Sequence, residues 1–427
     1  MTLKLGIIGC GGMGLRHVQG ISEVTKYSDI MSLEAVCDRH VSSARHVANA
    51  YEKNTGSKPK VYIDLQEMLD NSDIDVLDVV TDTRTHHSFA IDAMNRGINV
   101  MTEKPMAITL RACKKMEEIQ KKNNVKLAVA ENYRRDPMNR LVKALIDRDV
   151  IGSPQMVIDL SISGGGLLMH GTGWRAKKSM AGSLILEQGV HTADLILYFM
   201  GDAESIYART SVMQPKRRVS GMPHENIKKF YSHRIEDQLS ENKDVIIDTE
   251  DTAFSVIQFK SGAIGQMTMT SASNGYGFEN ESIHGTKGTI KILGSRNGRS
   301  PVLHFDSSIS KDKSLIVSGD GLLDLIPEWG LDDITSLYFD GAKRISSYDY
   351  NFEEIDRKLI AIEMHDLAYS ILNDATPEVE SIVGMKALAL AYGALESGEI
   401  NQIVSLEDVL SGKVDKYQSS INQELNI

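Results

Sequence analysis

The chain has 427 residues, of which 41% are hydrophobic and 25% are charged, a composition typical of a globular protein with more than one core. Its formal net charge of −11 argues against binding to the phosphate backbone of a nucleic acid. The longest apolar runs are too short to span a bilayer, and no basic segment followed by an apolar leader opens the sequence. We therefore expect a cytoplasmic protein without a nucleic-acid or membrane partner.

The cysteines and the paired histidines give no pattern typical of a metal site. Cys10, Cys37 and Cys113 are sparse and odd in number, which fits a reducing compartment better than a disulfide framework. His86 and His87 are adjacent, so they point apart at the start of a helix, and no cysteine or carboxylate set completes a site. We interpret the cysteines as small buried residues and expect no metal.

A glycine loop directly after an apolar strand is the first candidate site. Residues 3–14 read Leu-Lys-Leu-Gly-Ile-Ile-Gly-Cys-Gly-Gly-Met-Gly. In the G-x-G-x-x-G spacing the first glycine permits a tight turn, the second lets the backbone approach a pyrophosphate, and the third lets helix and strand pack closely. Unpaired N–H groups at the helix start attract the anion. We expect a dinucleotide to lie against Gly9, Gly11, Gly12, Met13 and Gly14.

A second apolar strand, Leu33–Cys37, ends at Asp38, which is about the distance past the glycines expected for an acid facing the adenosine ribose. A carboxylate accepts hydrogen bonds from a free 2′-hydroxyl but repels a 2′-phosphate, so Asp38 favours NAD over NADP. Arg39 leaves NADP possible, because its guanidinium could bind a phosphate or stack on the adenine. The other interpretation of Arg39 is a solvated surface arginine.

Strand-like runs alternate with amphipathic helical patterns from Leu3 to about Val129, which predicts a parallel sheet with helices on both faces. The functional strand ends should then meet at one edge, beside the glycine loop. The expected strands after the first are Leu33–Cys37, Val61–Ile63, Val76–Val80, Ile98–Met101 and Lys126–Ala130, with helices including Ser42–Tyr51 and Leu110–Lys122.

The pattern changes after Tyr133, and the rest of the chain predicts an α+β domain with a large, mostly antiparallel open sheet. One face of such a sheet can hold helices and the other a partner subunit, so we expect a homodimer or homotetramer. A helix is expected at Met138–Arg148, and strands at Gln155–Ser163, Ala203–Met213, Thr252–Phe259, Ala263–Ser271 and Thr289–Leu293.

The expected domains are residues 1–132, which bind the cofactor, and residues 133–427, which bind substrate and mediate oligomerisation. The polar segments 214–248 and 295–350 are interpreted as insertions or long loops. Helical periodicity returns at Ile355–Leu372 and Val383–Leu395, with Gly398 near the stop of the second helix. These last helices can pack back on the first domain.

Several motifs, in their order along the chain, resemble those of the glucose-fructose oxidoreductase, inositol dehydrogenase and MocA-like (Gfo/Idh/MocA) oxidoreductases. The resemblance covers most of the chain and implies a Rossmann domain, an α/β domain with an open sheet, and reversible hydride transfer between nicotinamide and a sugar or polyol hydroxyl carbon. Besides the glycine loop and Asp38, the matching segments are Val79-Val80-Thr81 followed by His86, Glu103-Lys104-Pro105, Arg135-Asp136-Pro137, residues 187–194 (Glu-Gln-Gly-Val-His-Thr-Ala-Asp) and the last helix, from Gly384 to Ser397.

Lys104 is the first candidate catalytic residue. It follows the strand Ile98–Met101 and precedes Pro105, which fixes the backbone, so its side chain can be held near the nicotinamide edge. The ammonium could hydrogen-bond the reacting hydroxyl and favour its alkoxide character. Spacing alone would also allow a solvated lysine, and the resemblance favours the catalytic role.

His191 lies in the apolar helical pattern Leu184–Leu197, where a lone histidine is usually a core residue, but the resemblance implies a general base. Glu187 is four residues earlier, on the same helical face, where it could orient the imidazole or bind a substrate hydroxyl. The family usually has Asp at this position. Asp194, one turn after His191, has equally good functional and structural interpretations.

The remaining candidates follow from the resemblance and from a glycine-rich loop before the His191 helix. Asp82 stands where many relatives have proline, so the loop beside the cofactor can differ in shape. A Trp and an Arg among glycines suit sugar stacking and hydroxyl binding, although a surface loop is an equal alternative. Further expected cofactor contacts are Thr81, Thr83, His86, Glu103 and Lys104, and expected substrate contacts are Lys104, Tyr133, Arg134, His170, Trp174, Arg175, Glu187 and His191.

Three functions fit these residues. The first is an NAD-dependent dehydrogenase of a sugar, polyol or glycoside hydroxyl. The second is a glycoside hydrolase that uses tightly bound NAD in a transient redox cycle. The third is a regulator that senses dinucleotide and sugar without turnover, and the presence of both Lys104 and His191 argues against it.

Overall fold

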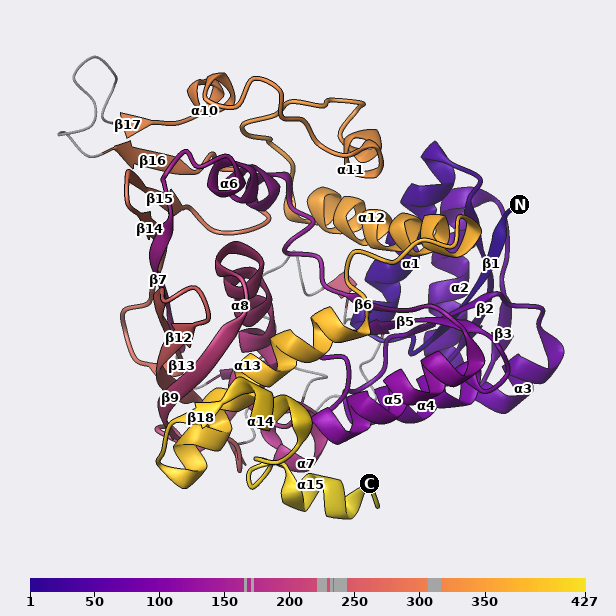
Figure 1. The fold of residues 1–427 in the computed structure, drawn as a ribbon. Coiled ribbons are helices and arrows are strands. Elements are labelled where there is room, and N and C mark those ends of the chain that lie inside the picture. Colours follow the sequence, from indigo (N-terminus) through magenta and orange to yellow (C-terminus); the bar gives the residue numbers. More distant parts are fainter. Residues whose placement is uncertain (165–166, 170–172, 221–228, 231–232, 234–243, 306–315) are drawn as a thin grey trace.

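The computed structural model of the chain contains two principal sheets and a small third one (Figure 1). The structure describes residues 1–164, 167–169, 173–220, 229–230, 233, 244–305 and 316–427. Among these residues, no helix has the length and apolar character that a membrane span requires.

The first sheet is parallel throughout, with the strand order β3-β2-β1-β4-β5-β6. The order reverses between β1 and β4, which is the point where a doubly wound sheet binds a dinucleotide. The predicted Rossmann fold is confirmed. Its strands are β1 (Leu3–Ile8), β2 (Met31–Cys37), β3 (Lys60–Tyr62), β4 (Val76–Val79), β5 (Asn99–Glu103) and β6 (Leu127–Ala130).

The helices of this half differ in how they begin. The Asp64 side chain caps α3 and the Thr109 side chain caps α5, each by accepting a backbone N–H of the first turn. No side chain caps α1, which starts after Gly11 and carries no acidic residue in its first turn. The helices are α1 (Gly12–Tyr27), α2 (Val41–Thr55), α3 (Leu65–Asn71), α4 (His86–Met94) and α5 (Leu110–Asn123).

The second sheet has the order β17-β16-β15-β14-β7-β13-β12-β9-β18. Every neighbouring pair in it is antiparallel except β7 and β13, so the expected mostly antiparallel sheet is confirmed. Its strands are β7 (Pro154–Gly164), β9 (Ala203–Ser211), β12 (Thr252–Phe259), β13 (Ile264–Ser273), β14 (Phe278–Gly285), β15 (Gly288–Ile292), β16 (Val302–Phe305), β17 (Ile316–Val317) and β18 (Val404–Ser405).

Three helices, α6 (Pro137–Asp147), α8 (Leu184–Met200) and α13 (Ser381–Ile400), lie on the face of this sheet that is turned toward the Rossmann domain (Figure 1). In the same view the opposite face carries no helix. The helix α8 therefore runs between the two sheets, where its polar side chains can face a cavity. The other short elements are η1 (Gly173–Ala176), α7 (Lys178–Ala181), α14 (Leu406–Ser411) and α15 (Ser419–Glu424).

The segments 214–248 and 295–350, interpreted as insertions or long loops, contain short regular elements in the part that the structure describes. The strands β8 (Leu167–Met169), β10 (Lys216–Ser220) and β11 (Asp244–Ile246) form the three-stranded sheet. Residues 302–305 and 316–317 extend the large sheet, and α10 (Asp320–Asp324) and α11 (Asp333–Tyr338) follow. Strands of two to five residues contain too little periodicity to be recognised, because pairing with a sheet edge determines them.

The helix α12 (Phe352–Leu372) packs on the Rossmann sheet through α1, and both helices share one hydrophobic core. Their approach is close, because a Cβ added to Gly20 would lie 2.4 Å from Cγ2 of Ile360. A segment late in the chain thus covers the first sheet, and the division into domains at residue 132 stays a prediction.

Gly398 lies near the stop of the second long C-terminal helix, as expected. It lies inside α13, which ends at Ile400 and is capped by Asn401 in the left-handed conformation. A Cβ on Gly398 would lie 2.2 Å from Oγ1 of Thr210 on β9. The glycine therefore allows the helix to approach the sheet, a requirement that only the packing reveals.

Candidate active site

A groove of about 460 Å³ lies along the carboxyl edge of the first sheet, lined by Gly9, Gly11, Gly12 and Met13. Gly9 has φ +99°, and a Cβ there would lie 2.4 Å from the carbonyl oxygen of Val80. A Cβ on Gly14 would lie 2.1 Å from the carbonyl oxygen of Gly9, so this glycine serves helix–strand packing. The uncapped start of α1 points its N–H groups into the groove, and a pyrophosphate fits that cradle.

Asp38 directly follows β2 and lines the bottom of this groove, where it is 8% exposed. Its carboxylate accepts hydrogen bonds from the backbone N–H of Cys10 (2.8 Å) and of His40 (2.9 Å). These bonds fix the carboxylate beside the glycine loop, and each oxygen keeps a second lone pair for a ribose hydroxyl. Arg39 is exposed on the rim of the groove, next to His40. The apolar side chains of Ile63, Leu65 and Phe89, which also line the groove, have the size needed to contact an adenine ring.

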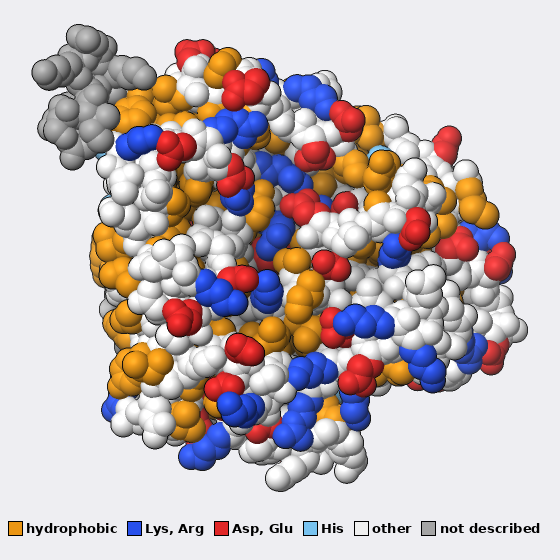
Figure 2. Space-filling view, in the orientation of Figure 1, with side chains coloured by type: hydrophobic (Ala, Val, Ile, Leu, Met, Phe, Trp, Pro, Cys, Tyr) orange, Lys and Arg blue, Asp and Glu red, His pale blue; other side chains and the backbone are white. Residues whose placement is uncertain are grey.

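A second cavity, of about 710 Å³, lies between the two sheets. Met13, Thr81, Trp174 and Arg175 line both cavities, so the two spaces adjoin. Figure 2 shows charged side chains of both signs gathered in the central hollow between the two halves of the molecule. The predicted residues Thr83, Glu103, Lys104, Tyr133, Glu187 and His191 also line this cavity.

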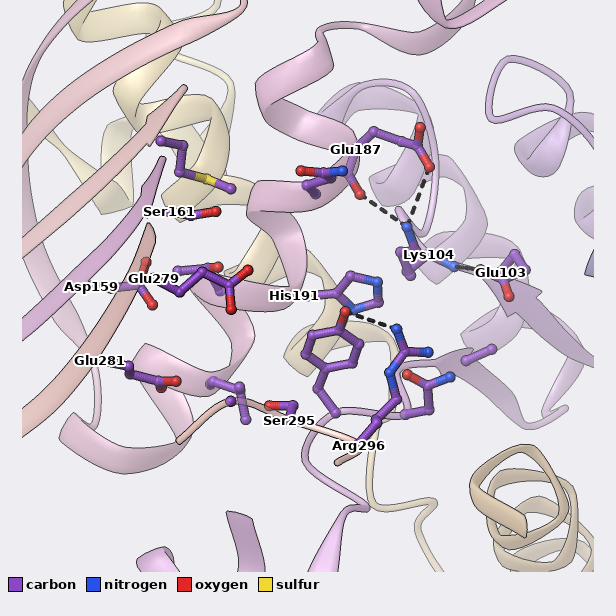
Figure 3. A pocket seen from close by; sticks show the side chains of 18 of the residues that line it. Glu103, Lys104, Asp159, Ser161, Glu187, His191, Glu279, Glu281, Ser295 and Arg296 are labelled. Atoms are coloured by element: carbon purple, nitrogen blue, oxygen red, sulfur yellow. Dashed lines mark hydrogen bonds and ion pairs between the residues drawn. The ribbon is translucent and has the colours of Figure 1, made fainter. Parts of the chain in front are cut away.

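Lys104 projects from the end of β5 toward α8 (Figure 3). Its Nζ donates to the backbone carbonyl oxygen of Glu187 (2.9 Å) and lies 3.5 Å from the Glu187 carboxylate. Arg175 forms an ion pair with the same carboxylate. Burial favours the protonated form of Glu187, but Arg175 and Lys104 outweigh it and lower the pKa of that carboxyl. The lysine is therefore held in the cavity by an ionised carboxylate.

The imidazole of His191 is oriented by Glu131, a residue without a predicted role. Nδ1 lies 2.8 and 2.7 Å from the two carboxylate oxygens of Glu131, which follows β6. The expectation that Glu187 orients the imidazole is wrong, since that carboxylate is engaged by Lys104 and Arg175. Within the described residues, no hydrogen bond engages Nε2 of His191, so this nitrogen is left for a ligand.

Electrostatics keep this imidazole neutral. Burial, the Lys104 ammonium and the Arg296 guanidinium lower the pKa of His191 well below its ordinary value. Burial also raises the pKa of Glu131 to about 7, although the N–H of Tyr133 and the charge of Lys104 oppose the rise. A neutral imidazole with a free ring nitrogen can accept a proton.

An aromatic and cationic stack holds the other side of His191. The ring of Tyr133 stacks on the imidazole with centroids 4.1 Å apart, and the Arg296 guanidinium lies 4.6 Å from the Tyr133 ring centroid. Arg296 also donates to the Tyr133 hydroxyl at 3.0 Å. Figure 3 shows Arg296 beside His191. The stack restricts rotation of the imidazole, so its free nitrogen keeps one direction.

Beneath Lys104, Glu103 is supported by a buried histidine. His17 on α1 contacts Asp78 through Nδ1 (2.7 Å) and Glu103 through Nε2 (3.0 Å). Burial opposes both charges, but Asp78 and Glu103 raise the pKa of His17 well above its ordinary value, and His17 lowers that of Glu103 to about 2. Glu103 in turn accepts from the backbone N–H of Lys104 (2.9 Å). This network fixes the backbone that carries the lysine.

Two predicted contacts, Arg134 and His86, are engaged by other parts of the chain. Arg134 is wrong as a substrate contact, because it is buried and donates through Nε to Asp194 at 2.8 Å. That pair gives Asp194 a structural role. His86 lines the cavity, but its two ring nitrogens contact the backbone carbonyls of Pro105 (2.9 Å) and Thr81 (3.2 Å). His170 lies outside the described residues.

The site also contains residues that were not predicted: Glu131, Arg296 and three carboxylates on the opposite wall, Asp159, Glu279 and Glu281. Glu131 directly follows an expected strand, which is a usable signal. Arg296 lies in a segment interpreted as a loop, and its φ of 58° is unusual for a non-glycine residue. The three carboxylates lie on β7 and β14, and pairing of these strands decides that they meet.

Comparison with known proteins identifies both halves. Residues 3–131 match the oxidoreductase family with an NAD-binding Rossmann fold, and residues 139–291 match the GFO/IDH/MocA C-terminal domain. The chain belongs to the Gfo/Idh/MocA oxidoreductase family. It is an NAD-dependent oxidoreductase, and the groove beside the glycine loop lies within the matched NAD-binding Rossmann domain.

The relatives within this family are distant. Levoglucosan dehydrogenase of Pseudarthrobacter phenanthrenivorans is 27% identical over 304 residues, which are 68% of this chain and 73% of that protein. Myo-inositol 2-dehydrogenase of Thermotoga maritima is 23% identical over 409 residues, 96% of this chain and 100% of that protein. The structure of levoglucosan dehydrogenase in complex with NADH has a TM-score of 0.73 at 22% identity, covering 95% of this chain and 99% of that one. This structural likeness shows the shared fold.

Proposed function

We propose that this protein is an NAD-dependent dehydrogenase of a secondary hydroxyl on a sugar, a polyol or a glycoside. The observation that carries the proposal is the neutral imidazole of His191, fixed by Glu131 and Tyr133 with Nε2 left for a ligand beside Lys104. The names of the related levoglucosan and inositol dehydrogenases support the substrate class. When bound, the nicotinamide accepts a hydride from the carbinol carbon.

In this mechanism His191 removes the hydroxyl proton. Nε2 accepts the proton while Nδ1–H donates to Glu131, so the carboxylate stabilises the imidazolium as it forms. The free nitrogen needs no reorientation, because the stack of Tyr133 and Arg296 restricts the ring. Glu131 acts through His191 and is a positioning residue.

Lys104 stabilises the negative charge that develops on the same hydroxyl oxygen. Its ammonium has three donor hydrogens, and the contacts with Glu187 in this structure leave donor capacity for a substrate oxygen. Glu187 holds the ammonium from one side and is itself held by Arg175. The carboxylate thus positions the lysine and can accept a hydrogen bond from a neighbouring substrate hydroxyl.

The experiment is to follow the absorbance of reduced nicotinamide with a panel of sugars, polyols and glycosides, with product analysis in parallel. Net reduction of NAD supports the dehydrogenase. Cleavage of a glycoside without net change of cofactor supports the hydrolase with a transient redox cycle. Binding of cofactor and sugar without either reaction supports the regulator, and both of the last two outcomes contradict the proposal.

We also propose that the protein is a homo-oligomer assembled through the open face of the large sheet. Tyr207, Phe254, Val256 and Ile264 are exposed on adjacent strands of that sheet. Hydrophobic side chains also gather along the left edge of Figure 2, over this sheet. Exposed apolar patches of this kind mark protein interfaces. A monomer mass by light scattering at micromolar concentration would contradict the proposal.

A further inference from the structure

The wall of the cavity opposite Lys104 and His191 carries three carboxylates. Figure 3 shows Asp159, Glu279 and Glu281 together on one side, with Lys104 and His191 across from them. Asp159 on β7 and Glu281 on β14 are direct cross-strand partners, and Glu279 pairs with Ser161 two residues away. Side chains so paired lie on one face of the sheet, roughly 5 Å apart at Cβ. We call these three residues the acidic wall.

Nothing in the sheet neutralises the acidic wall. The row across the strands that contains Asp159 and Glu281 is flanked by Met267 on β13 and Ile292 on β15. Asp159 is 9% exposed and lines the cavity, and within the described residues neither it nor Glu281 has a hydrogen bond or ion pair. Like charges placed directly opposite each other in a sheet are destabilising, so the arrangement lacks a structural purpose.

The basic residues of the cavity are engaged elsewhere or exposed. Arg175 pairs with Glu187, and Arg296 contacts Tyr133 and Asp356. Lys291 and Arg299 line the cavity but are exposed. Burial and the neighbouring carboxylates raise the pKa of Asp159 to about 7 and that of Glu281 to about 8. The acidic wall therefore lacks a positive partner.

We propose that the acidic wall binds a protonated amine of the substrate, so that the enzyme oxidises an amino sugar or an aminocyclitol. The inference rests on the proposed function, because it names the substrate of the same cavity. An ammonium donates three hydrogen bonds and carries the charge that the wall lacks. Its hydroxyl-bearing ring then extends toward Lys104 and His191, with the reacting carbon and the amine at opposite ends.

Other ligands fit the wall less well. An anionic sugar, such as a uronate or a sugar phosphate, would add a further negative charge beside carboxylates that already repel each other. A neutral polyol can donate hydroxyl hydrogens to the wall but brings no positive charge that would offset the repulsion between its carboxylates. A metal ion is not favoured, because no set of three histidine, cysteine or carboxylate groups with suitable geometry occurs in the described part of the chain.

The test is calorimetric titration of the protein with NADH present, using amines and their parent alcohols. The probes are 3-amino-3-deoxy-D-glucose and D-glucosamine against D-glucose, and scyllo-inosamine against scyllo-inositol. A hydrogen-bonded charge pair in a buried site should make at least one amine bind about 10- to 100-fold tighter than its parent. Asp159→Asn and Glu281→Gln should each remove about tenfold of this preference for the amine over its parent alcohol.

Glu204→Gln is the matched control, because Glu204 is exposed on β9 of the same sheet and does not line the cavity. It should keep the full preference for the amine. Thermal unfolding checks that the Asp159 and Glu281 variants fold, and neither should unfold at a lower temperature than the wild type, since each substitution removes repulsion.

Equal binding of every amine and its parent alcohol overturns the inference, as does an amine preference that survives both wall substitutions. These outcomes are distinct from failure of the proposed function. Amine-selective binding without reduction of NAD contradicts the dehydrogenase but retains the binding site, whereas oxidation of neutral polyols without amine preference contradicts the binding site alone.

Discussion

The two walls of the substrate cavity differ in how their charges are balanced. Around Lys104, nearly every charge has a partner: Glu187 is held by Arg175 and Lys104, and Glu103 by His17. On the opposite wall, Asp159 and Glu281 face each other without a cation. Catalytic groups need a fixed geometry before the substrate binds. Groups that only bind the substrate can have their charge balanced by the substrate itself.

Within one cavity, the wall of Lys104 and His191 would therefore carry out the reaction and the acidic wall would recognise the substrate. Substitutions on the wall of Lys104 and His191 should slow the chemistry with every substrate. Substitutions on the acidic wall should change which substrate binds and should raise stability. The predictions below test this separation in order of decreasing effect.

His191→Ala should have the largest effect. A positioned general base contributes about 10²–10⁴-fold, so kcat should fall by that order, and less at high pH where hydroxide substitutes. Lys104→Ala should lower kcat and raise KM, because it removes both alkoxide stabilisation and a substrate contact. Steady-state kinetics measure both, with NADH binding as the control. Full turnover in a folded His191→Ala protein would show that the histidine is only a packing residue.

The double variant sharpens this result. If His191 and Lys104 act on the same oxygen as one unit, the double variant should be scarcely slower than the slower single variant. If the double variant instead loses the product of the two single losses in kcat, the two side chains act independently.

Glu131→Gln should lower kcat by about 10- to 100-fold. Losses of this size follow when the carboxylate that orients a metal-binding histidine is replaced in other proteins. Because the pKa of Glu131 is about 7, its carboxylate accepts Nδ1–H above that pH and leaves Nε2 unprotonated. Below it, the protonated acid donates to Nδ1 and favours the tautomer with hydrogen on Nε2, which cannot take a proton.

Oxidation by the wild type should therefore decline as the pH falls through about 7. Burial raises this pKa, Glu103 adds to the rise, and Lys104 and Arg134 oppose it. The Glu131→Gln variant should lose this step in its profile of kcat against pH. An unchanged step in the variant would assign the titration to another group.

Asp38→Ser tests the cofactor end of the site, and its effect should be smaller. The wild type should bind NAD more tightly than NADP, because the carboxylate accepts from ribose hydroxyls and repels a 2′-phosphate. The substitution should lower the ratio of the Kd for NADP to the Kd for NAD by at least about tenfold. Titration of both cofactors by fluorescence measures it, and tighter wild-type binding of NADP would mean that Arg39 governs the site.

Asp159→Asn should give the smallest effect, an increase in Tm of about 1–3 °C. The folded-state pKa values of Asp159 and Glu281 are raised to about 7 and about 8, so the wild type loses stability as the pH rises from near 4 through these values. The difference in Tm between variant and wild type should therefore widen between about pH 5 and pH 8. A difference independent of pH would show that the carboxylates do not repel each other.

The sequence predicted the cofactor half well because its signals are local. The strand, the glycine loop and the helix are contiguous from Leu3 to Tyr27, and Asp38 directly follows the next strand. The mixed polar and apolar run of β14, Phe278–Gly285, showed no clear alternation and was missed, although it pairs along its whole length with β7. Pairing with a neighbour, and not its own pattern, makes this segment a strand.

The sequence alone predicted the Rossmann domain, the family, NAD as the cofactor and the candidates Lys104 and His191, because each depends on a short motif with fixed spacing. Only the tertiary structure decided that Glu131 and not Glu187 orients His191, that Arg296 completes the stack on Tyr133, and that Asp159 meets Glu281. These contacts join segments far apart in the chain. Their geometry follows from how two sheets and α8 pack together, a relation that no local pattern of residues encodes.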